Sequence, residues 1–289
     1  MAPKILIATP AYGDMVHRGY HESVAGMVSA FARAAPGIVF EQKVVNIPVL
    51  SMARNILVSL VLDDPSYTHL LFVDADMAFS PSLVAKMLQS GRPFVACVYP
   101  EKLTHWKELG ETLADPEVPT MQARLIASSY VCAEAVMEKV LADGRRLVEV
   151  VDGMIQFGLV GTGVMLVSRE ALLTLREGFP NLWVEEPAEE VRERGLTRGG
   201  LLRCFDTFVN EDGYLVGEDI AFCHRWRQVG GEIWAVVDEA IVHQGVARYQ
   251  GHALIALKSD PALRVRGVAK RSRGRDDPWY LRVLRAPRA

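Results

Sequence analysis

The sequence His69-Leu70-Leu71-Phe72-Val73-Asp74-Ala75-Asp76 contains the clearest strand in the chain. Its four consecutive apolar residues, 70–73, predict a strand that is buried on both faces, as in a parallel sheet. The apolar run ends at Asp74, and Asp76 follows one residue later. In open α/β sheets, ligands bind beyond the carboxyl ends of the strands, so these two acids lie where a ligand is expected.

Strands and helices alternate on both sides of this stretch. Apolar runs at 5–8 and 94–98 predict strands, the short apolar stretches 38–40 and 44–45 predict another, and the spacing of apolar residues at 24–31 predicts a helix. Ser51 is a candidate cap for a second helix, and Ser80-Pro81 begins a third that ends at Gly91. The alternation predicts an α/β domain with a mostly parallel central sheet flanked by helices.

The second half of the chain adds a small antiparallel hairpin region. Asp152-Gly153 and the turn at 210–213 predict two hairpins, and a strand at 164–167 precedes a helix near Ser168. A further helix begins near Asp219 and a strand covers 232–237. Residues 185–200 are charged and without periodicity, which predicts a mobile loop.

Composition and charge exclude several classes of protein. The 289 residues carry a formal net charge of -3, which excludes a generally basic nucleic-acid coat. Nine Lys or Arg and two acids fall within 264–289, so we divide the chain into one domain at 1–263 and a basic tail at 264–289. The four cysteines form no C-x-x-C pair, and no apolar run approaches the roughly 18 residues of a membrane span. These features predict a cytoplasmic protein without a transmembrane segment.

Three groups of residues are candidates for chemistry. Asp74 and Asp76 can hold a hard divalent cation against a diphosphate, or they are a solvated turn. His243 ends the short apolar stretch 240–242 and is either a further ligand for Mn²⁺ or an ordinary histidine. Glu218 and Asp219 precede a helix, where an acid can cap the helix or accept a proton from an acceptor hydroxyl.

Three further segments are candidates for ligand contact. Arg54-Asn55 lies in the first turn of a predicted helix, where an anion or a base can bind. The loop 9–14 contains Tyr12, which can stack on a base. The backbone at 161–163 can approach a ligand closely, or it is a tight turn after a hairpin. The chain has no P-loop, no G-x-G-x-x-G and no G-x-S-x-G motif.

The order of these segments resembles the small GT-A-type glycosyltransferases of bacteria and bacteriophages, which are similar to glycosyltransferase family 2. The resemblance runs from Lys4 to about Gly245 and rests on the segments KILIATPAYG, SMARN, HLLFVDADMAF, ACVYPEK, GTGVMLVSREAL, GEDIAFCHRWRQVGGEIW and VDEAIVHQG. It implies a Rossmann-like GT-A sheet.

The resemblance also implies roles for individual residues. It implies Asp76 as the direct metal ligand, His243 as a further ligand, and Asp74 as a metal-site residue that faces the nucleotide ribose. Asp219 or Glu218 corresponds to the general base of inverting members. The implied donor-binding residues are Thr9, Pro10, Tyr12, Asp14, Arg54, Asn55, Asp74, Ala75, Gly161, Thr162 and Gly163.

The implied activity is metal-dependent transfer of a hexosyl group from a nucleotide-diphosphate sugar, with a UDP-sugar favoured, to an acceptor hydroxyl. The implied cofactor is Mn²⁺ or Mg²⁺. If the reaction inverts the anomeric centre, Asp219 or Glu218 takes the proton; if it retains the configuration, these acids bind substrate. The acceptor is a glycan, a lipid-linked molecule or, through the basic tail, a modified nucleic acid.

Two other classes remain as alternatives. A nucleotidyltransferase also uses metal-bound carboxylates at a sheet edge, but it brings a glycine-rich loop with Lys or Arg after the first strand, and 9–14 contains no basic residue. A non-catalytic module that binds a nucleotide sugar or a glycan would not need the acids at 74, 76, 218 and 219 together with His243.

Overall fold

The computed structural model describes residues 2–193, 199–259 and 263–268. Within these residues a sheet of ten strands has the order β17-β7-β8-β14-β5-β9-β3-β1-β2, and β6 pairs with β7. The strands are β1 (Lys4–Pro10), β2 (Val39–Val45), β3 (His69–Val73), β5 (Phe94–Cys97), β6 (Lys139–Val140), β7 (Arg146–Val151), β8 (Met154–Phe157), β9 (Val164–Ser168), β14 (Ile233–Val236) and β17 (Leu263–Val268).

The expectation of a mostly parallel sheet is wrong, because the sheet is mixed. Strand β1 is parallel to β2 and β3, and β5 is parallel to β14, but β9 lies antiparallel between β3 and β5. Strand β8 is antiparallel both to β7, its partner in the hairpin, and to β14. The apolar run 70–73 indicates that both faces of the strand are buried. A strand can be buried on both faces beside an antiparallel neighbour as well as beside a parallel one.

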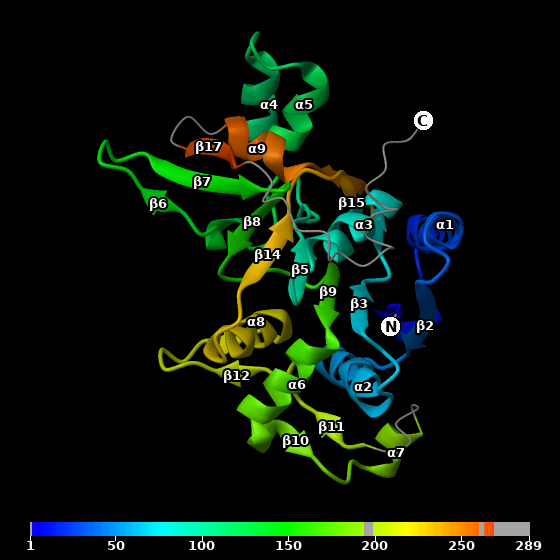
Figure 1. The fold of residues 1–289 in the computed structure, drawn as a ribbon. Helices are drawn as coiled ribbons and strands as arrows, with labels where there is room; N and C mark the ends of the chain where they lie inside the picture. Colours follow the sequence, from blue (N-terminus) through cyan, green and yellow to red (C-terminus); the bar gives the residue numbers. More distant parts are fainter. Residues whose placement is uncertain (1, 194–198, 260–262, 269–289) are drawn as a thin grey trace.

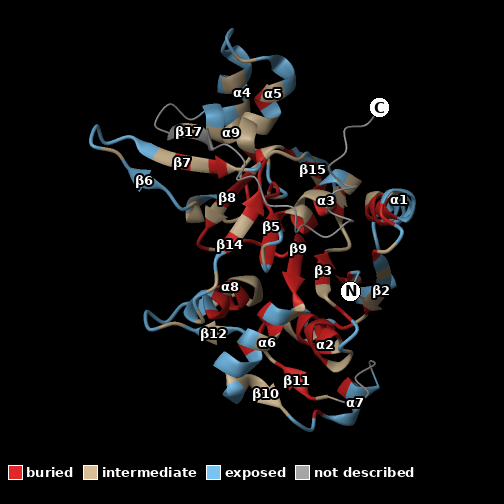
Figure 2. Ribbon diagram, in the orientation of Figure 1, coloured by how far each residue is buried: buried red, intermediate tan, exposed pale blue. Residues whose placement is uncertain are grey.

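Helices cover both faces of the sheet, as the alternating pattern predicts (Figure 1). Leu70 and Phe72 of β3 pack in the core beneath α2 (Leu50–Asp63), α6 (Arg169–Gly178) and α8 (Glu218–Gln228). Leu71 and Val73 pack on the opposite face, under α1 (Arg18–Ala34) and α3 (Pro81–Ser90). Strands β3, β5 and β9 are therefore buried along their length (Figure 2).

The remaining elements form smaller units around this sheet. A three-stranded sheet contains β4 (Met77–Phe79), β15 (Ile241–Gln244) and β16 (Arg248–Gly251), and three helices lie together beyond it: α4 (Trp106–Ala114), α5 (Thr120–Ile126) and α9 (Ala253–Ser259). Two short antiparallel pairs join β10 (Trp183–Val184) to β11 (Leu201–Leu202) and β12 (Phe208–Val209) to β13 (Leu215–Val216). The short helical elements are η1 (Tyr12–Asp14), η2 (Ala133–Ala135), η3 (Pro180–Leu182) and α7 (Glu189–Arg192).

Most local signals act where the sequence places them. Ser80 occupies the N-cap position of α3 but its side chain makes no capping hydrogen bond, and Gly91 ends the helix at φ 60. The Ser168 side chain caps α6 by accepting the N–H of Ala171 at 3.2 Å. Ser51 does not cap α2, because the helix already begins at Leu50. The expected loop at 185–200 contains the short helix α7, and its residues 194–198 lie outside the described residues.

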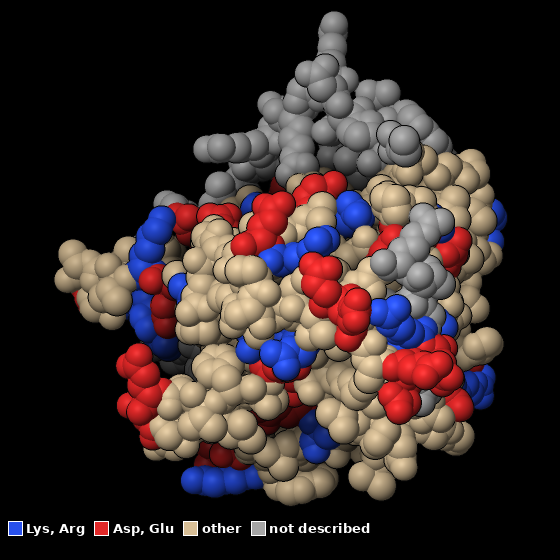
Figure 3. Space-filling model, turned by 90° about the horizontal axis from the view of Figure 1, so that it is seen from below, with Lys and Arg blue, Asp and Glu red and all other residues tan. Residues whose placement is uncertain are grey.

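The C-terminal boundary falls inside regular structure. Residues 264–268 of the predicted tail belong to β17, which pairs in parallel with β7. Residues 269–289 lie outside the described part. On the face in Figure 3, acidic and basic side chains are intermixed. All four cysteines are free thiols, and in the described part no helix has the length and apolar character needed to cross a membrane.

The turn at Asp152-Gly153 gives the first testable prediction. Gly153 has φ +76, and an added Cβ would overlap the carboxylate of Asp238. Gly144 has φ +79 with open space around it, so it is a matched control. We expect Gly144→Ala to cost about 1 kcal/mol of unfolding free energy from backbone strain alone. Gly153→Ala should cost clearly more in urea denaturation, and equal costs would contradict the close approach of Asp238.

Candidate active site

The predicted site residues converge on one edge of the sheet. Because β9 runs antiparallel to β3, the residues that precede β9 lie beside those that follow β3. The backbone N–H of Asp74 donates to the carbonyl of Gly163 at 2.9 Å. The D-x-D segment and residues 161–163 are therefore in contact, although the antiparallel strand that joins them was not expected.

A buried arginine connects three elements at this edge. Arg54 of α2 is 3% exposed, and its Nη1 donates to Glu218 Oε1 at 2.6 Å. Its Nη2 donates to both carboxylate oxygens of Asp74 at 3.1 Å. Burial lowers the pKa of the guanidinium and the carboxylates of Asp74 and Glu218 raise it, with a net increase. Arg54 thus stays charged and fixes the end of β3 against the start of α8.

Asp76 and His243 are brought together by the pairing of β4 with β15. Met77 lies opposite His243 in that ladder, and the N–H of Gln244 donates to the carbonyl of Asp76 at 2.8 Å. His243 Nδ1 lies 2.9 Å from the carbonyl oxygen of Pro100, which only accepts, so Nδ1 carries a proton. His243 Nε2 lies 3.6 Å from Asp76 Oδ2, where it pairs with the acid when the ring is protonated and offers its lone pair to a cation when the ring is neutral.

A lysine that the sequence reasoning passed over also reaches this acid. The Lys102 ammonium donates to Asp76 Oδ2 and forms an ion pair with it. Burial raises the pKa of Asp76, whereas its interactions with His243 and Lys102 lower it, and the net pKa is about 2. Asp76 is therefore ionised at neutral pH, and a cation already lies against it.

The three predicted metal-site residues separate into two groups. Asp76 and His243 face each other, but Asp74 turns toward Arg54. Within the residues that the structure describes, no cluster of three or more His, Cys, Asp or Glu side chains is placed to hold a metal. The protein thus offers one carboxylate and one imidazole for a cation, and a bound ligand would have to complete its coordination.

Glu218 and Asp219 differ in their surroundings although they are adjacent. Gly217 is the N-cap of α8, both acids lie in its first turn, and Glu218 is held by Arg54. Asp219 Oδ1 accepts the N–H of Ile220 at 2.8 Å, and no side chain among the described residues forms an ion pair with Asp219. Burial and the neighbouring charge of Glu218 raise the pKa of Asp219. Asp219 is therefore the better candidate for accepting a proton.

The glycines at 161 and 163 make room for an aromatic ring. A Cβ on Gly163 would lie 2.7 Å from Tyr99 Cε1, and one on Gly161 would lie 2.9 Å from Tyr99 Cζ. The Tyr99 ring also meets the His243 ring edge-on, with centroids 5.2 Å apart. Burial raises the pKa of Tyr99 above its usual range. Tyr99 thus forms the wall between these glycines and His243, and only its place in ACVYPEK, the segment that also contains Lys102, gave a signal for it.

The predicted donor-binding residues fall into buried and exposed sets. The hydroxyl of Thr9 is fully buried and lies 2.5 Å from Tyr20 Oη. The Asn55 amide is also internal, since it donates to Asp206 and accepts the N–H of Phe205, both at 2.7 Å. These two side chains are used for internal hydrogen bonds, whereas the ring of Tyr12 is 72% exposed.

Four other predicted residues have mixed surroundings. Pro10 ends β1, and the carboxylate of Asp14 accepts a hydrogen bond from Asn46 Nδ2 at 2.9 Å. The carbonyl of Ala75 accepts the N–H of His17 at 2.8 Å. Thr162 is buried between its two glycines, and its hydroxyl has no hydrogen-bond partner among the described residues. Of these residues, Asp14 is exposed, Pro10 and Ala75 are half-buried, and Thr162 is buried.

Comparisons with known proteins leave this site unassigned. No family model matches the chain, and no curated protein matches it. Among solved structures, the chain is similar to A197 from STIV, with 14% identity over 85% of this chain and 86% of that chain and a TM-score of 0.40. A likeness at this level carries no argument about fold family or activity, so the chemistry has to be argued from the residues.

The buried arginine gives the second prediction. Arg54→Met leaves Asp74 and Glu218 without a countercharge, and we expect a loss of about 3 kcal/mol in unfolding free energy. Arg18→Met is the control, because Arg18 is 88% exposed and its i,i+4 pair with Glu22 is worth only about 0.5 kcal/mol. Adding Asp74→Asn and Glu218→Gln to Arg54→Met should restore part of the loss in urea denaturation. A triple variant that is less stable than Arg54→Met would contradict this account.

The raised pKa of Asp219 gives the third prediction. The unfolded carboxyl ionises near pH 4, so the native state binds more protons than the unfolded state from there up to the raised native pKa. Wild-type stability therefore falls as the pH rises through that window. Asp219→Asn carries no charge and keeps an oxygen for Ile220, so it should be more stable than wild type at pH 7 and lose this advantage below about pH 4.

The control for this prediction is Asp212→Asn in the exposed turn of the β12–β13 hairpin, which should match wild type at both pH values. Urea denaturation at several pH values measures all three proteins. Equal stability of Asp219→Asn and wild type at pH 7 would show that the Asp219 carboxylate is not destabilised by its surroundings.

Proposed function

We propose that this chain is a GT-A-type glycosyltransferase that moves a hexosyl group from a nucleotide-diphosphate sugar, a UDP-sugar by preference, to an acceptor hydroxyl. The observation that carries the proposal is the convergence, at one sheet edge, of the Asp76–His243 pair with the acid Asp219. One part of the edge can hold a cation and the other can take a proton, which are the two requirements of such a transfer.

Asp76 and His243 would hold the divalent cation, Mn²⁺ or Mg²⁺. Their donor set fits such an ion, because Asp76 is ionised and the Nδ1–H···O=C bond to Pro100 leaves His243 Nε2 as a lone pair. The bound cation supplies Lewis-acid neutralisation of charge on the departing diphosphate. Lys102 would leave Asp76 when the cation binds and would then be free to pair with a phosphate oxygen.

Asp219 would act as the general base of an inverting transfer. The acceptor oxygen forms a bond to the anomeric carbon, the bond from that carbon to the diphosphate oxygen breaks, and the acceptor proton goes to Asp219. A raised pKa favours this role, because a carboxylate that is destabilised by burial accepts a proton more readily. Glu218 is a positioning residue here, since its bond to Arg54 fixes the first turn of α8.

The exposed side chains at the N-terminal loop would receive the nucleotide. Tyr12 is free to stack on the base, and the loop of Tyr12–Asp14 follows β1 at the same sheet edge. Arg54 is too tightly paired to bind a diphosphate directly. Arg54 instead fixes the position of Asp74, and in this way it also fixes the backbone that leads to Asp76.

The fourth prediction tests the proposal through binding. Thermal unfolding is measured with UDP, GDP, CMP and dTDP, each with and without Mn²⁺, on wild type, Asp76→Asn and the control Asp143→Asn in the β6–β7 turn. We expect one nucleotide, UDP, to raise the midpoint by several degrees at about 100 times its Kd, and only with Mn²⁺. Asp76→Asn should lose this shift and Asp143→Asn should keep it.

Activity separates an enzyme from a module that only binds. Asp219→Asn should keep the UDP–Mn²⁺ shift and lose hydrolysis or transfer of the UDP-sugar by at least about 100-fold, since general-base catalysis contributes roughly that much. Absence of any nucleotide shift in the folded wild-type protein would overturn the proposal. Retention of full activity in Asp219→Asn would overturn the role of that residue.

A further inference from the structure

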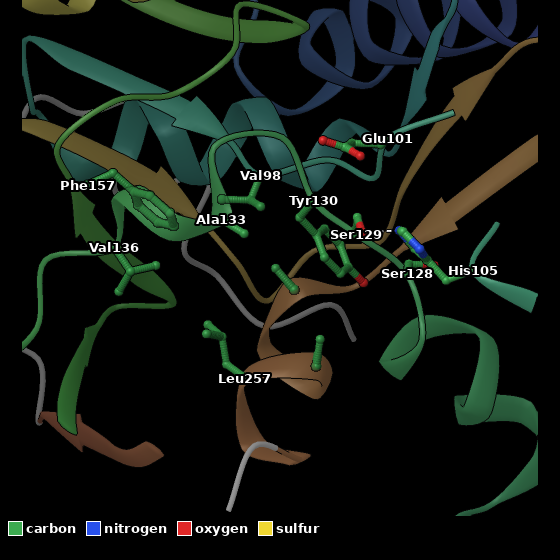
Figure 4. Close-up of a pocket in the computed structure, with 12 residues that line it drawn as sticks. Val98, Glu101, His105, Ser128, Ser129, Tyr130, Ala133, Val136, Phe157 and Leu257 are labelled. Atoms are coloured by element: carbon green, nitrogen blue, oxygen red, sulfur yellow. Dashed lines mark hydrogen bonds between the residues drawn. The ribbon is translucent and has the colours of Figure 1, made fainter. Parts of the chain in front are cut away.

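A cavity lies beside the segment that contains Val98 and Glu101. It has a volume of about 410 Å³, which is within the usual range for small-molecule sites. One side is apolar and is formed by Val98, Tyr130, Val136, Phe157, Ala256 and Leu257 (Figure 4). Ala256 and Leu257 belong to α9, and this helix packs against the core cluster that contains Leu70 and Phe72. An apolar cavity of this size gains free energy when it exchanges water for a hydrocarbon group.

The other side of the cavity is polar. His105 Nε2 and Ser129 Oγ form a hydrogen bond of 2.5 Å, and Ser128 and Glu101 also line the cavity. Figure 4 shows the Ser129–His105 pair opposite Phe157, Val136 and Leu257. The cavity therefore matches a molecule with an apolar body and a polar end. The Glu101 carboxylate disfavours an anionic end, whereas hydroxyl groups can bond to serine and histidine.

The wall between this cavity and the candidate active site is thin. The wall consists of residues 98–102 and 129–131. A β-bridge joins Pro100 to Tyr130, and the backbone N–H of Glu101 donates a hydrogen bond to the carbonyl of Ser129 at 2.9 Å. Val98 and Glu101 line the cavity. On the other side of the wall, Tyr99 and the carbonyl of Pro100 contact His243. A molecule in the cavity would thus lie beside the residues proposed to hold the cation.

We propose that this cavity binds the apolar part of a neutral amphiphilic acceptor, such as an alkyl or aryl group joined to a hydroxyl-bearing head. The proposal rests on the proposed function, because it names the acceptor class of that site. The acceptor is neutral because Glu101 lies at the polar side, and it is amphiphilic because the two sides of the cavity differ. The cavity gives no reason to expect a nucleic acid.

The probe is a series of n-butyl, n-hexyl and n-octyl β-D-glucosides, each used below its critical micelle concentration. Calorimetric titration of the full chain should show saturable binding of one molecule. Affinity should rise by up to about four-fold per added methylene until the cavity is full. Octanoate has an apolar chain of similar length with a carboxylate end, and it should bind clearly more weakly than n-octyl glucoside. Glu101→Gln should reduce that difference.

Two matched variants locate the binding. Ala256→Phe fills the cavity and should weaken n-octyl glucoside binding by at least ten-fold. Ala32→Phe introduces the same ring on the exposed surface of α1 and should leave binding unchanged. If Ala256→Phe does not fold, Leu257→Asn, which makes the apolar side polar, replaces it and should also weaken binding. Binding that is independent of chain length, or that is equal in wild type and the cavity variant, would overturn the proposal.

The same titrations separate this inference from the proposed function. Nucleotide and Mn²⁺ binding without glucoside binding would leave the glycosyltransferase proposal intact and would overturn the acceptor site. Chain-length-dependent glucoside binding without any nucleotide shift would support the cavity as an amphiphile site and would overturn the glycosyltransferase. With both present, n-octyl glucoside should also increase UDP release from the UDP-sugar in wild type, and this increase should be lost in Ala256→Phe.

Discussion

The arrangement of the candidate site depends on one buried guanidinium. Arg54 is placed inside the protein by α2, and it satisfies its charge with Asp74 at the end of β3 and Glu218 at the start of α8. A charge this deeply buried is tolerated only where carboxylates of good geometry compensate for its lost hydration. The three elements are therefore fixed relative to one another. Because Asp74 is held in this way, the chain direction at Asp76 is fixed as well.

A second constraint is the pairing of β4 with β15. These strands are separated by more than half of the chain, yet their ladder sets Met77 opposite His243 and so brings the histidine to Asp76. The carbonyl of Pro100 then selects the tautomer that leaves Nε2 facing the acid. The metal-binding capacity proposed for this pair thus follows from backbone hydrogen bonds on three separate segments. A change in the register of β15 by one residue would turn the imidazole to the other face.

The sequence predicts the individual helices and strands better than it predicts which of them lie side by side. The runs at 70–73 and 94–98, the Asp152-Gly153 turn and the cap at Ser168 are local signals, and each marks a strand, hairpin or helix of the structure. Two features depend on contacts distant in sequence and were missed: the antiparallel insertion of β9 and the ion pair of Lys102 with Asp76. The sequence pattern of a strand buried on both faces is the same whether its neighbour is parallel or antiparallel. The residues around Lys102 likewise give no indication that its ammonium group reaches Asp76.

The same limit applies to individual site residues. Thr9 and Asn55 belong to motifs that resemble donor-binding segments, but their side chains are used in hydrogen bonds inside the protein, to Tyr20 and to the chain at 205–206. Asp74 was grouped with Asp76 because they are one residue apart. A turn at residues 75–76 separates the two acids, and Arg54 holds Asp74 while Lys102 and His243 face Asp76, so a spacing of two residues does not make them ligands of one ion.

The two acids that matter most in the proposal have pKa values displaced in opposite directions. Asp76 lies between a lysine and a histidine and has a pKa of about 2, whereas burial and Glu218 raise the pKa of Asp219. A single pair of carboxylates can divide the work of a reaction when their environments differ in this way. Asp76 keeps its charge and so suits a cation, and Asp219 is the acid that gains from taking up a proton. Arg54 limits this difference, because its positive charge lowers the pKa of Asp219 and opposes the effects of burial and of Glu218.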